Sequence, residues 1–73
     1  MNLSLIFDDI NVDYYLTMIH PDGGISGPTR ILMIDSDRQG LAHLRKTKKH
    51  YPNCKLILEK QGQSGSHVKI AEL

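Results

Sequence analysis

Apolar and polar residues alternate with a period of two along several short parts of the chain, which is the pattern typical of β-strands. Val12 to Ile19 carries apolar side chains on both of its faces. The strands are expected at Leu3 to Phe7, at Val12 to Ile19, between Ile25 and Asp35 with Arg30 to Ile34 as the surest part, at Cys54 to Lys60, and around Val68 and Ile70.

Turn residues separate these strands. The segment His20 to Gly24 is the strongest turn, because Pro21 fixes φ and the following glycines accept positive φ without strain. Gly27-Pro28 would interrupt a central ladder, so the third strand is expected at an edge or with a bulge. Gln61 to Ser66 is a loose Gly/Ser turn that would join the last two strands as a hairpin.

A single helix is predicted over Asp35 to Asn53. Ser36 can serve as its N-cap with Gln39 three residues on, which is the capping-box spacing. Tyr51 is disfavoured in α geometry because Pro52 follows it, so the helix should end there. The order β-β-β-α-β-β predicts an α+β fold, in which a mostly antiparallel sheet of four to five strands carries one helix on one face.

Projection of the helix at about 100° per residue separates an apolar face from a basic face. The core-facing side is expected to hold Gly40, Leu41, Leu44, Thr47, Tyr51 and the aliphatic part of Lys48. The opposite side holds the candidate partner-binding residues, which are Arg38, Arg45, Lys46 and Lys49 with Ala42 between them, and Lys55 is expected to extend this surface.

The composition is that of one folded domain spanning residues 1 to 73, because 40% of the residues are apolar and 23% are charged. A single cysteine, Cys54, excludes a disulfide within the chain and is typical of a reducing compartment, so a cytoplasmic location is expected. Asp8 and Asp9 interrupt the apolar start, and no apolar run approaches the length of a membrane span. Neither a signal peptide nor a transmembrane segment is therefore predicted.

A helix on one side of the sheet would leave the other side uncovered. That second face is expected to carry more apolar surface than a monomer usually exposes, so a homodimer through this face or through a sheet edge is predicted. Its residues, depending on strand register, would come from Ile6, Tyr15, Ile19, Leu32, Ile34 and Ile57.

Metal and cofactor chemistry has weak support in the sequence. His43, His50 and Cys54 are metal-ligand types, but their spacing does not match the paired ligands of structural zinc sites. Further ligands would have to come from the distant His20 or His67, or from an aspartate. No glycine-rich phosphate loop opens a helix, so we expect neither a metal nor a cofactor.

Catalytic residues can be imagined in two turns. Ser64, Ser66 and His67 share a glycine-rich turn, and His20 lies near Asp22 in another. No third orienting group stands at a recognisable spacing, and the strand-turn-helix context of a nucleophile elbow is absent from the pattern. The protein is therefore expected not to be an enzyme, and a small hydrolase or nuclease is the third alternative.

The small size of the chain and the absence of a catalytic or cofactor motif favour an interaction protein, for which the apolar sheet face and the basic helix face are the expected docking surfaces. The net charge is +1, but residues 1 to 37 hold six Asp against one Arg, whereas residues 38 to 73 hold eight Lys or Arg against two Glu. The expected function is binding, and thereby regulating or inhibiting, a larger protein or nucleoprotein partner, as small accessory anti-defence proteins of phages and mobile elements do. The alternative is nucleic-acid binding through the basic helix face, although one Phe and no Trp leave few residues for base stacking.

Overall fold

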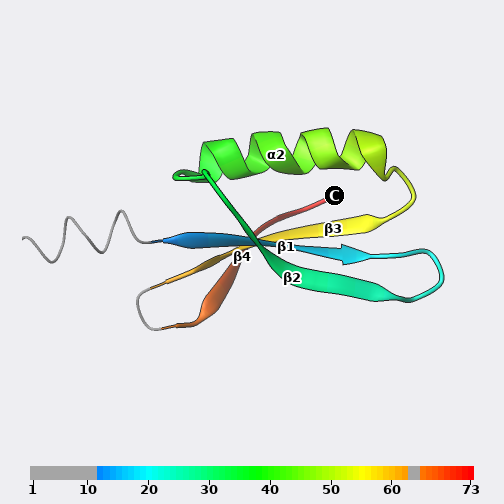
Figure 1. Ribbon diagram of the computed structural model, residues 1–73, viewed down its shortest axis with the longest axis horizontal. Coiled ribbons are helices and arrows are strands. Elements are labelled where there is room, and N and C mark those ends of the chain that lie inside the picture. The colour runs from blue at the N-terminus through cyan, green and yellow to red at the C-terminus, as the bar shows by residue number, and fades with distance from the viewer. Residues whose placement is uncertain (1–11, 63–64) are drawn as a thin grey trace, which may run out of the picture.

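The computed structural model describes residues 12–62 and 65–73, which form one antiparallel sheet and one helix. The elements are β1 (Asp13–Ile19), β2 (Ile25–Ile31), α2 (Asp37–His50), β3 (Lys55–Gln61) and β4 (His67–Glu72). The sheet order is β2-β1-β3-β4, and α2 lies along one face of the sheet (Figure 1). This arrangement confirms the α+β class.

The order of elements in the described residues is β-β-α-β-β, not the predicted β-β-β-α-β-β. The predicted first strand, Leu3 to Phe7, lies outside the described residues. The strand predicted at Val12 to Ile19 is present as β1, and it is central in the sheet because it pairs with β2 on one side and with β3 on the other. The predicted hairpin of the last two strands is also confirmed, since β3 and β4 are antiparallel neighbours.

The first hairpin has the turn that the sequence predicts. The backbone N–H of Gly23 donates to the carbonyl of His20 at 2.9 Å, and the N–H of His20 donates to the carbonyl of Gly24 at 2.8 Å. Gly23 has a φ of 92°, which a glycine adopts without a steric penalty. The turn therefore closes tightly and sets the pairing between β1 and β2.

The edge strand β2 has an irregularity at Gly27, as predicted. The register passes from Leu16↔Thr29 to Met18↔Ser26, so β2 contributes one extra residue as a bulge. Gly27 has a φ of 102°, and a Cβ atom there would lie 2.6 Å from the carbonyl oxygen of Leu16. Glycine is thus required at this point for both conformation and space.

The surest part of the third predicted strand, Arg30 to Ile34, is correct only for Arg30 and Ile31. β2 covers Ile25–Ile31, whereas Leu32 and Met33 form a turn and Met33 has a φ of 64°. The apolar pattern continues to Ile34, but the chain must leave the sheet edge there to reach the start of α2. This change of direction ends the strand, and it leaves the Met33 side chain 97% exposed.

The ends of α2 confirm the predicted capping residue and shorten the predicted helix. The hydroxyl oxygen of Ser36 accepts from the backbone N–H of Gln39 at 3.2 Å. The side-chain oxygen of Gln39 accepts from the N–H of Asp35 at 2.9 Å, one residue before the usual capping-box partner. At the other end, the N–H of Tyr51 donates to the carbonyl of Thr47, and the helix stops at His50.

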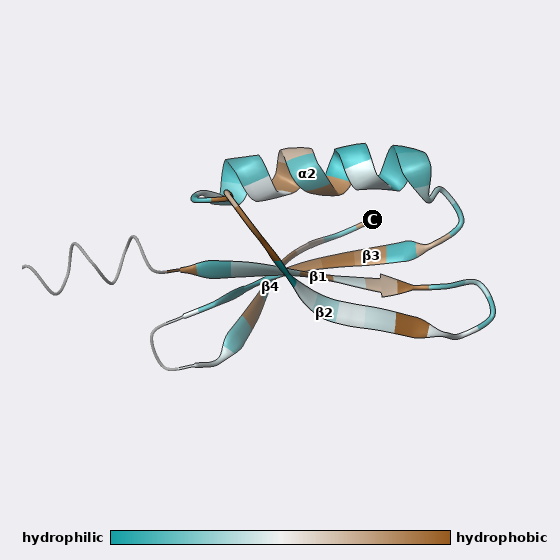
Figure 2. Cartoon of the chain, in the orientation of Figure 1, coloured by the Kyte–Doolittle hydropathy of each residue, from teal (hydrophilic) through white to brown (hydrophobic). Residues whose placement is uncertain are grey.

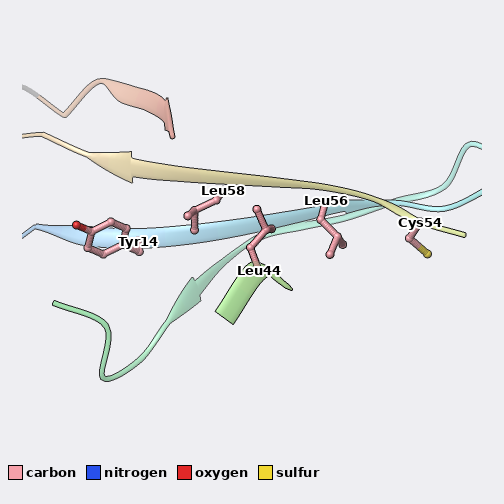
Figure 3. Packing of buried hydrophobic residues seen from close by; sticks show 5 residues of the cluster. All are labelled: Tyr14, Leu44, Cys54, Leu56 and Leu58. Carbon is pink, nitrogen blue, oxygen red and sulfur yellow. The ribbon is translucent and has the colours of Figure 1, made fainter. Parts of the chain in front are cut away.

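The core lies between α2 and the central strands (Figure 3). Leu44 from the helix and Leu56 and Leu58 from β3 are fully buried, and Tyr14 and Cys54 extend this cluster at its two ends. Gly40 is buried as well, because a Cβ atom there would lie 3.0 Å from a methyl group of Leu58. The helix backbone can approach β3 closely at this glycine.

The second sheet face is less apolar than the sequence predicts. Tyr15, Ile19 and Ile57 lie on it and are half-buried, as the cross-strand registers require. Leu32 lies in the turn after β2, and Ile34 packs against the core on the helix side, so neither belongs to this face. Ile6 lies outside the described residues.

The homodimer stays a prediction. In the described residues, Ile19 lies opposite Ile25 near one end of the second face, and Ile25 is largely exposed. We expect this apolar end of the face to be covered by a second copy of the chain. Sedimentation equilibrium would show a concentration-dependent dimer, and a monomer at the highest attainable concentrations would contradict the expectation.

Candidate functional site: the basic face of the helix

Four cationic residues form a stripe along the outer face of α2, which we call the basic stripe. Its members are Arg38, Arg45, Lys46 and Lys49, and all four are exposed. The stripe extends over about 16 Å, given a rise of about 1.5 Å per residue. Hydrophilic residues cover most turns of the helix, as Figure 2 shows. The two faces predicted for the helix are therefore both present.

The cations of the sheet differ from the basic stripe because they are paired with carboxylates. Arg30 contacts Asp13 at 3.2 Å, which links β2 to β1. Lys55 and Lys69 both contact Glu72, at 3.0 Å and 3.2 Å, and these two lysines hold the pKa of Glu72 below its usual value. Positive charge on this part of the surface is thus locally neutralised.

Lys55 does not extend the basic stripe. It begins β3, and its neighbour Leu56 points into the core beneath α2. Because side chains alternate along a strand, Lys55 projects from the face opposite the helix, where it pairs with Glu72. The four helix cations, in contrast, have no ion pair or side-chain hydrogen bond with any other described residue.

A buried tyrosine holds the start of α2 against the sheet. The hydroxyl of Tyr14 donates to a carboxylate oxygen of Asp37 at 2.6 Å, and the ammonium of Lys60 contacts the same oxygen at 3.2 Å. Burial, and then the hydrogen bond to Asp37, raises the pKa of Tyr14 to about 12. The hydrogen bond from Tyr14, assisted by Lys60, lowers the pKa of Asp37. This cluster fixes the orientation of the helix that carries the stripe.

Replacing Tyr14 with Phe is expected to lower the free energy of unfolding by about 1–2 kcal/mol at neutral pH, because a hydrogen bond to a charged group is lost. The lowered pKa of Asp37 contributes stability that is present above the ordinary value of 3.8 and is lost as the pH falls through the folded-state pKa. The difference between Tyr14→Phe and wild type should therefore shrink in acid. Urea denaturation of both proteins at a series of pH values from 7 into the acid range would measure this difference.

The matched control is Tyr15→Phe. The hydroxyl of Tyr15 donates to the uncharged side chain of Gln61 at 3.2 Å. Loss of this hydrogen bond should lower the free energy of unfolding by less, and the decrease should not depend on pH over this range. Equal losses for the two variants, or a Tyr14→Phe deficit that persists in acid, would show that the contact with Asp37 does not stabilise the helix.

A hollow of 480 Å³ lies beside the basic stripe on the flank of α2. It is lined by His43, Lys46, Thr47, His50 and Tyr51. Tyr51 was predicted to pack into the core, but it follows the last helical residue and is 48% exposed. The reason is that the chain leaves helical geometry at Tyr51, which releases its side chain from the core-facing arc.

Cys54 lies beside His20, which the sequence offered only as a more distant ligand, and not beside His43 or His50. The Sγ atom of Cys54 is 3.5 Å from Nδ1 of His20, and Nε2 of His20 is 2.9 Å from the hydroxyl oxygen of Ser26. His43 and His50 lie instead in the hollow. In residues 12–62 and 65–73, no three side chains of the His, Cys, Asp or Glu types are grouped so that they could hold a metal ion.

The histidines considered for catalysis lie apart. His20 contacts Ser26 and Cys54, while Asp22 accepts from the backbone N–H of Gly24. His67 stacks on Tyr15 with ring centroids 4.9 Å apart and lies 3.8 Å from a carboxylate oxygen of Glu59. Ser64 falls outside the described residues. The turns thus do not bring His20 and His67 into one group.

Comparison with known protein families, curated proteins and solved structures found no match to this chain. In the described part of the chain, the one helix is too short and too polar to cross a membrane.

Sequence reasoning did not find the hollow or the cluster at Tyr14. The hollow could have been found from the helical spacing, because positions 43, 46, 47 and 50 fall on one flank. The contacts of Tyr14 with Asp37 and of Cys54 with His20 span 23 and 34 residues of sequence, and no local pattern signals them.

Proposed function

We propose that the protein is a small non-enzymatic interaction module that docks the basic stripe of α2 onto an acidic surface of a larger protein partner. One observation supports this most strongly: cations on the sheet are neutralised by neighbouring carboxylates, whereas the four cations of the stripe have no such partner in the described residues. Exposed, uncompensated charge on one rigid element attracts a surface of opposite sign and accelerates encounter.

A protein partner is favoured over nucleic acid by the size of the charged surface. Four phosphate contacts give a salt dependence with a slope of about −3.6, whereas proteins that bind DNA firmly make roughly 6 to 10 such contacts. The sheet cannot add contacts without breaking its own ion pairs, since Arg30, Lys55 and Lys69 are all engaged. An acidic protein surface needs only a few charges to match the stripe.

The protein would act by covering part of the partner's surface. A stripe about 16 Å long is too small for a stable interface by itself, because specific interfaces bury roughly 800 Å² on each partner. The exposed turn of Leu32 and Met33 precedes the helix and could supply apolar contact beside Arg38. Binding at these places would regulate or inhibit the partner by covering its acidic surface.

The experiment that tests the proposal is affinity capture from a nuclease-treated extract of the native host, with Arg45→Glu/Lys49→Glu as the comparison bait. A protein retained by the wild type and lost with the double reversal would support the proposal. Gel-mobility assays with random DNA and RNA over a salt series form the second arm. Binding to nucleic acid with a salt slope near the value for four contacts, and no captured protein, would support the nucleic-acid alternative instead.

A further inference from the structure

The hollow on the flank of α2 has the dimensions of a ligand site. Its volume of 480 Å³ has room for a small charged group, and the hollow is open to solvent rather than enclosed. The spacing of its lining residues places successive side chains on one flank of the helix. Tyr51, where the chain leaves the helix, is one of the lining residues.

The lining side chains are rich in hydrogen-bond donors. Lys46 offers three N–H donors, and each of the imidazoles of His43 and His50 offers at least one. The hydroxyl of Thr47 already donates to the carbonyl of His43 at 2.8 Å, so its oxygen can only accept from a ligand. None of the described residues that line the hollow carries a carboxylate, and the positive charge of Lys46 is not paired with any of the described residues.

The other two histidines have contacts that these two lack. His20 lies against Cys54 and Ser26, and His67 lies against Tyr15 and Glu59. His43 and His50 make no side-chain hydrogen bond or ion pair with another described residue. Two imidazoles and one ammonium therefore face the same hollow without an acceptor.

We infer that this hollow binds a phosphate monoester group. A phosphate monoester carries a charge of about −1.5 to −2 at pH 7 and three strong acceptor oxygens, which can be shared among Lys46, His43 and His50. A carboxylate offers only two oxygens in one plane. The aromatic ring of Tyr51 provides an apolar wall for the organic part of the ester. The phosphate site does not depend on the proposed protein partner. It has only Lys46 in common with the basic stripe.

The test is a titration of the whole chain with inorganic phosphate, at constant pH and ionic strength, followed by NMR of the four histidine rings. We expect saturable shifts for His43 and His50, while His20 and His67 serve as internal references because they lie outside the hollow. His43→Ala/His50→Ala lacks both reporting rings, so its phosphate affinity is measured by calorimetric titration. It should be at least about tenfold weaker than that of the wild type, because two donors of charge-assisted hydrogen bonds are lost. Acetate at the same ionic strength should not reproduce the shifts.

Parallel shifts of all four histidines, or equal shifts with acetate, would mean ordinary counterion screening and would overturn the inference. Arg45→Glu/Lys49→Glu, which alters the stripe without altering the lining of the hollow, should still show saturable shifts of His43 and His50. Failure of the stripe proposal and failure of the phosphate site are thus separable.

The source of the phosphate is distinguished by two further ligands. A phosphoserine peptide that binds more tightly than inorganic phosphate would assign the site to a phosphorylated side chain of a partner. A nucleoside monophosphate that binds more tightly would assign it to a small phosphorylated molecule. Absence of saturable binding by all three probes would contradict the site.

Discussion

Replacing Leu44 with alanine is expected to lower the free energy of unfolding by about 2 to 4 kcal/mol, the largest stability effect that we expect from a single substitution in this chain. Leu44 is fully buried and packs with Leu56 and Leu58 in a cluster that holds five buried hydrophobic residues in the described part of the chain. The surrounding side chains cannot close the cavity without moving the helix. A domain of this length has a total stability of roughly 4 to 11 kcal/mol, so the loss would be severe.

The control is Arg45→Ala, the next residue on the opposite face, which should change stability by no more than about 0.5 kcal/mol. Urea denaturation at neutral pH compares the two. If Leu44→Ala proves too unstable to fold, Leu41→Ala offers a milder test, because Leu41 is only half-buried beside the core. Equal costs for a core-facing leucine and for Arg45 would show that the helix is oriented differently.

Reversing both Arg45 and Lys49 to Glu is expected to produce the largest functional effect. The substitutions change the net charge by four units. Both side chains are exposed and contact no carboxylate in the described residues, so the fold should be retained. Affinity for an acidic partner should fall by at least about tenfold, because like charges would then face each other across the interface. Circular dichroism and urea denaturation verify the fold, and calorimetric titration with the captured partner measures the affinity.

Arg30→Glu/Lys69→Glu is the charge-matched control for this double reversal. It changes the same four units of charge on the sheet and breaks the exposed ion pairs with Asp13 and Glu72, which contribute little to stability because solvent screens them. Lys60→Glu would be a poorer control, because Lys60 contacts Asp37 in the cluster that anchors the helix. Equal loss of affinity with both double variants would indicate an effect of net charge alone and would argue against the stripe.

The helix could be predicted from the sequence because its signals are local. Ser36 and Gln39 determine the start through contacts within four residues, and Tyr51 before Pro52 determines the stop. The 3.6-residue period then separates the buried Leu44 from the exposed Arg45. The same period places the basic stripe on the outer face of the helix, so four of the five predicted partner-binding residues lie together.

The remaining features depend on where the chain changes direction. The apolar run from Ile31 to Ile34 suits a strand, yet the chain must turn at Leu32 and Met33 to pass from the sheet edge to the helix. The position of Lys55 was missed for a related reason: the turn after the helix determines which sheet face it joins, and helical projection does not extend past Pro52.

Long-range contacts could not be predicted from a single sequence. Tyr14 lies in the strand predicted at Val12 to Ile19, but its hydroxyl has a partner, Asp37, on a different element. His20 was considered beside Asp22, its neighbour in the turn, although the hairpin and β3 bring it to Ser26 and Cys54 instead. Local spacing indicates which side chains share a face, while the packing of the elements decides which of them touch.

The association rate of the captured partner, measured over a range of salt concentrations, tests the central claim most directly. Steering by the basic stripe predicts that the wild type associates fast at low salt and slows steeply as salt is added, since exposed charges are screened over about 10 Å at 0.1 M. Arg45→Glu/Lys49→Glu should associate slowly at every salt concentration, whereas Arg30→Glu/Lys69→Glu should stay close to the wild type. An unchanged rate and salt dependence in the stripe variant would contradict the account.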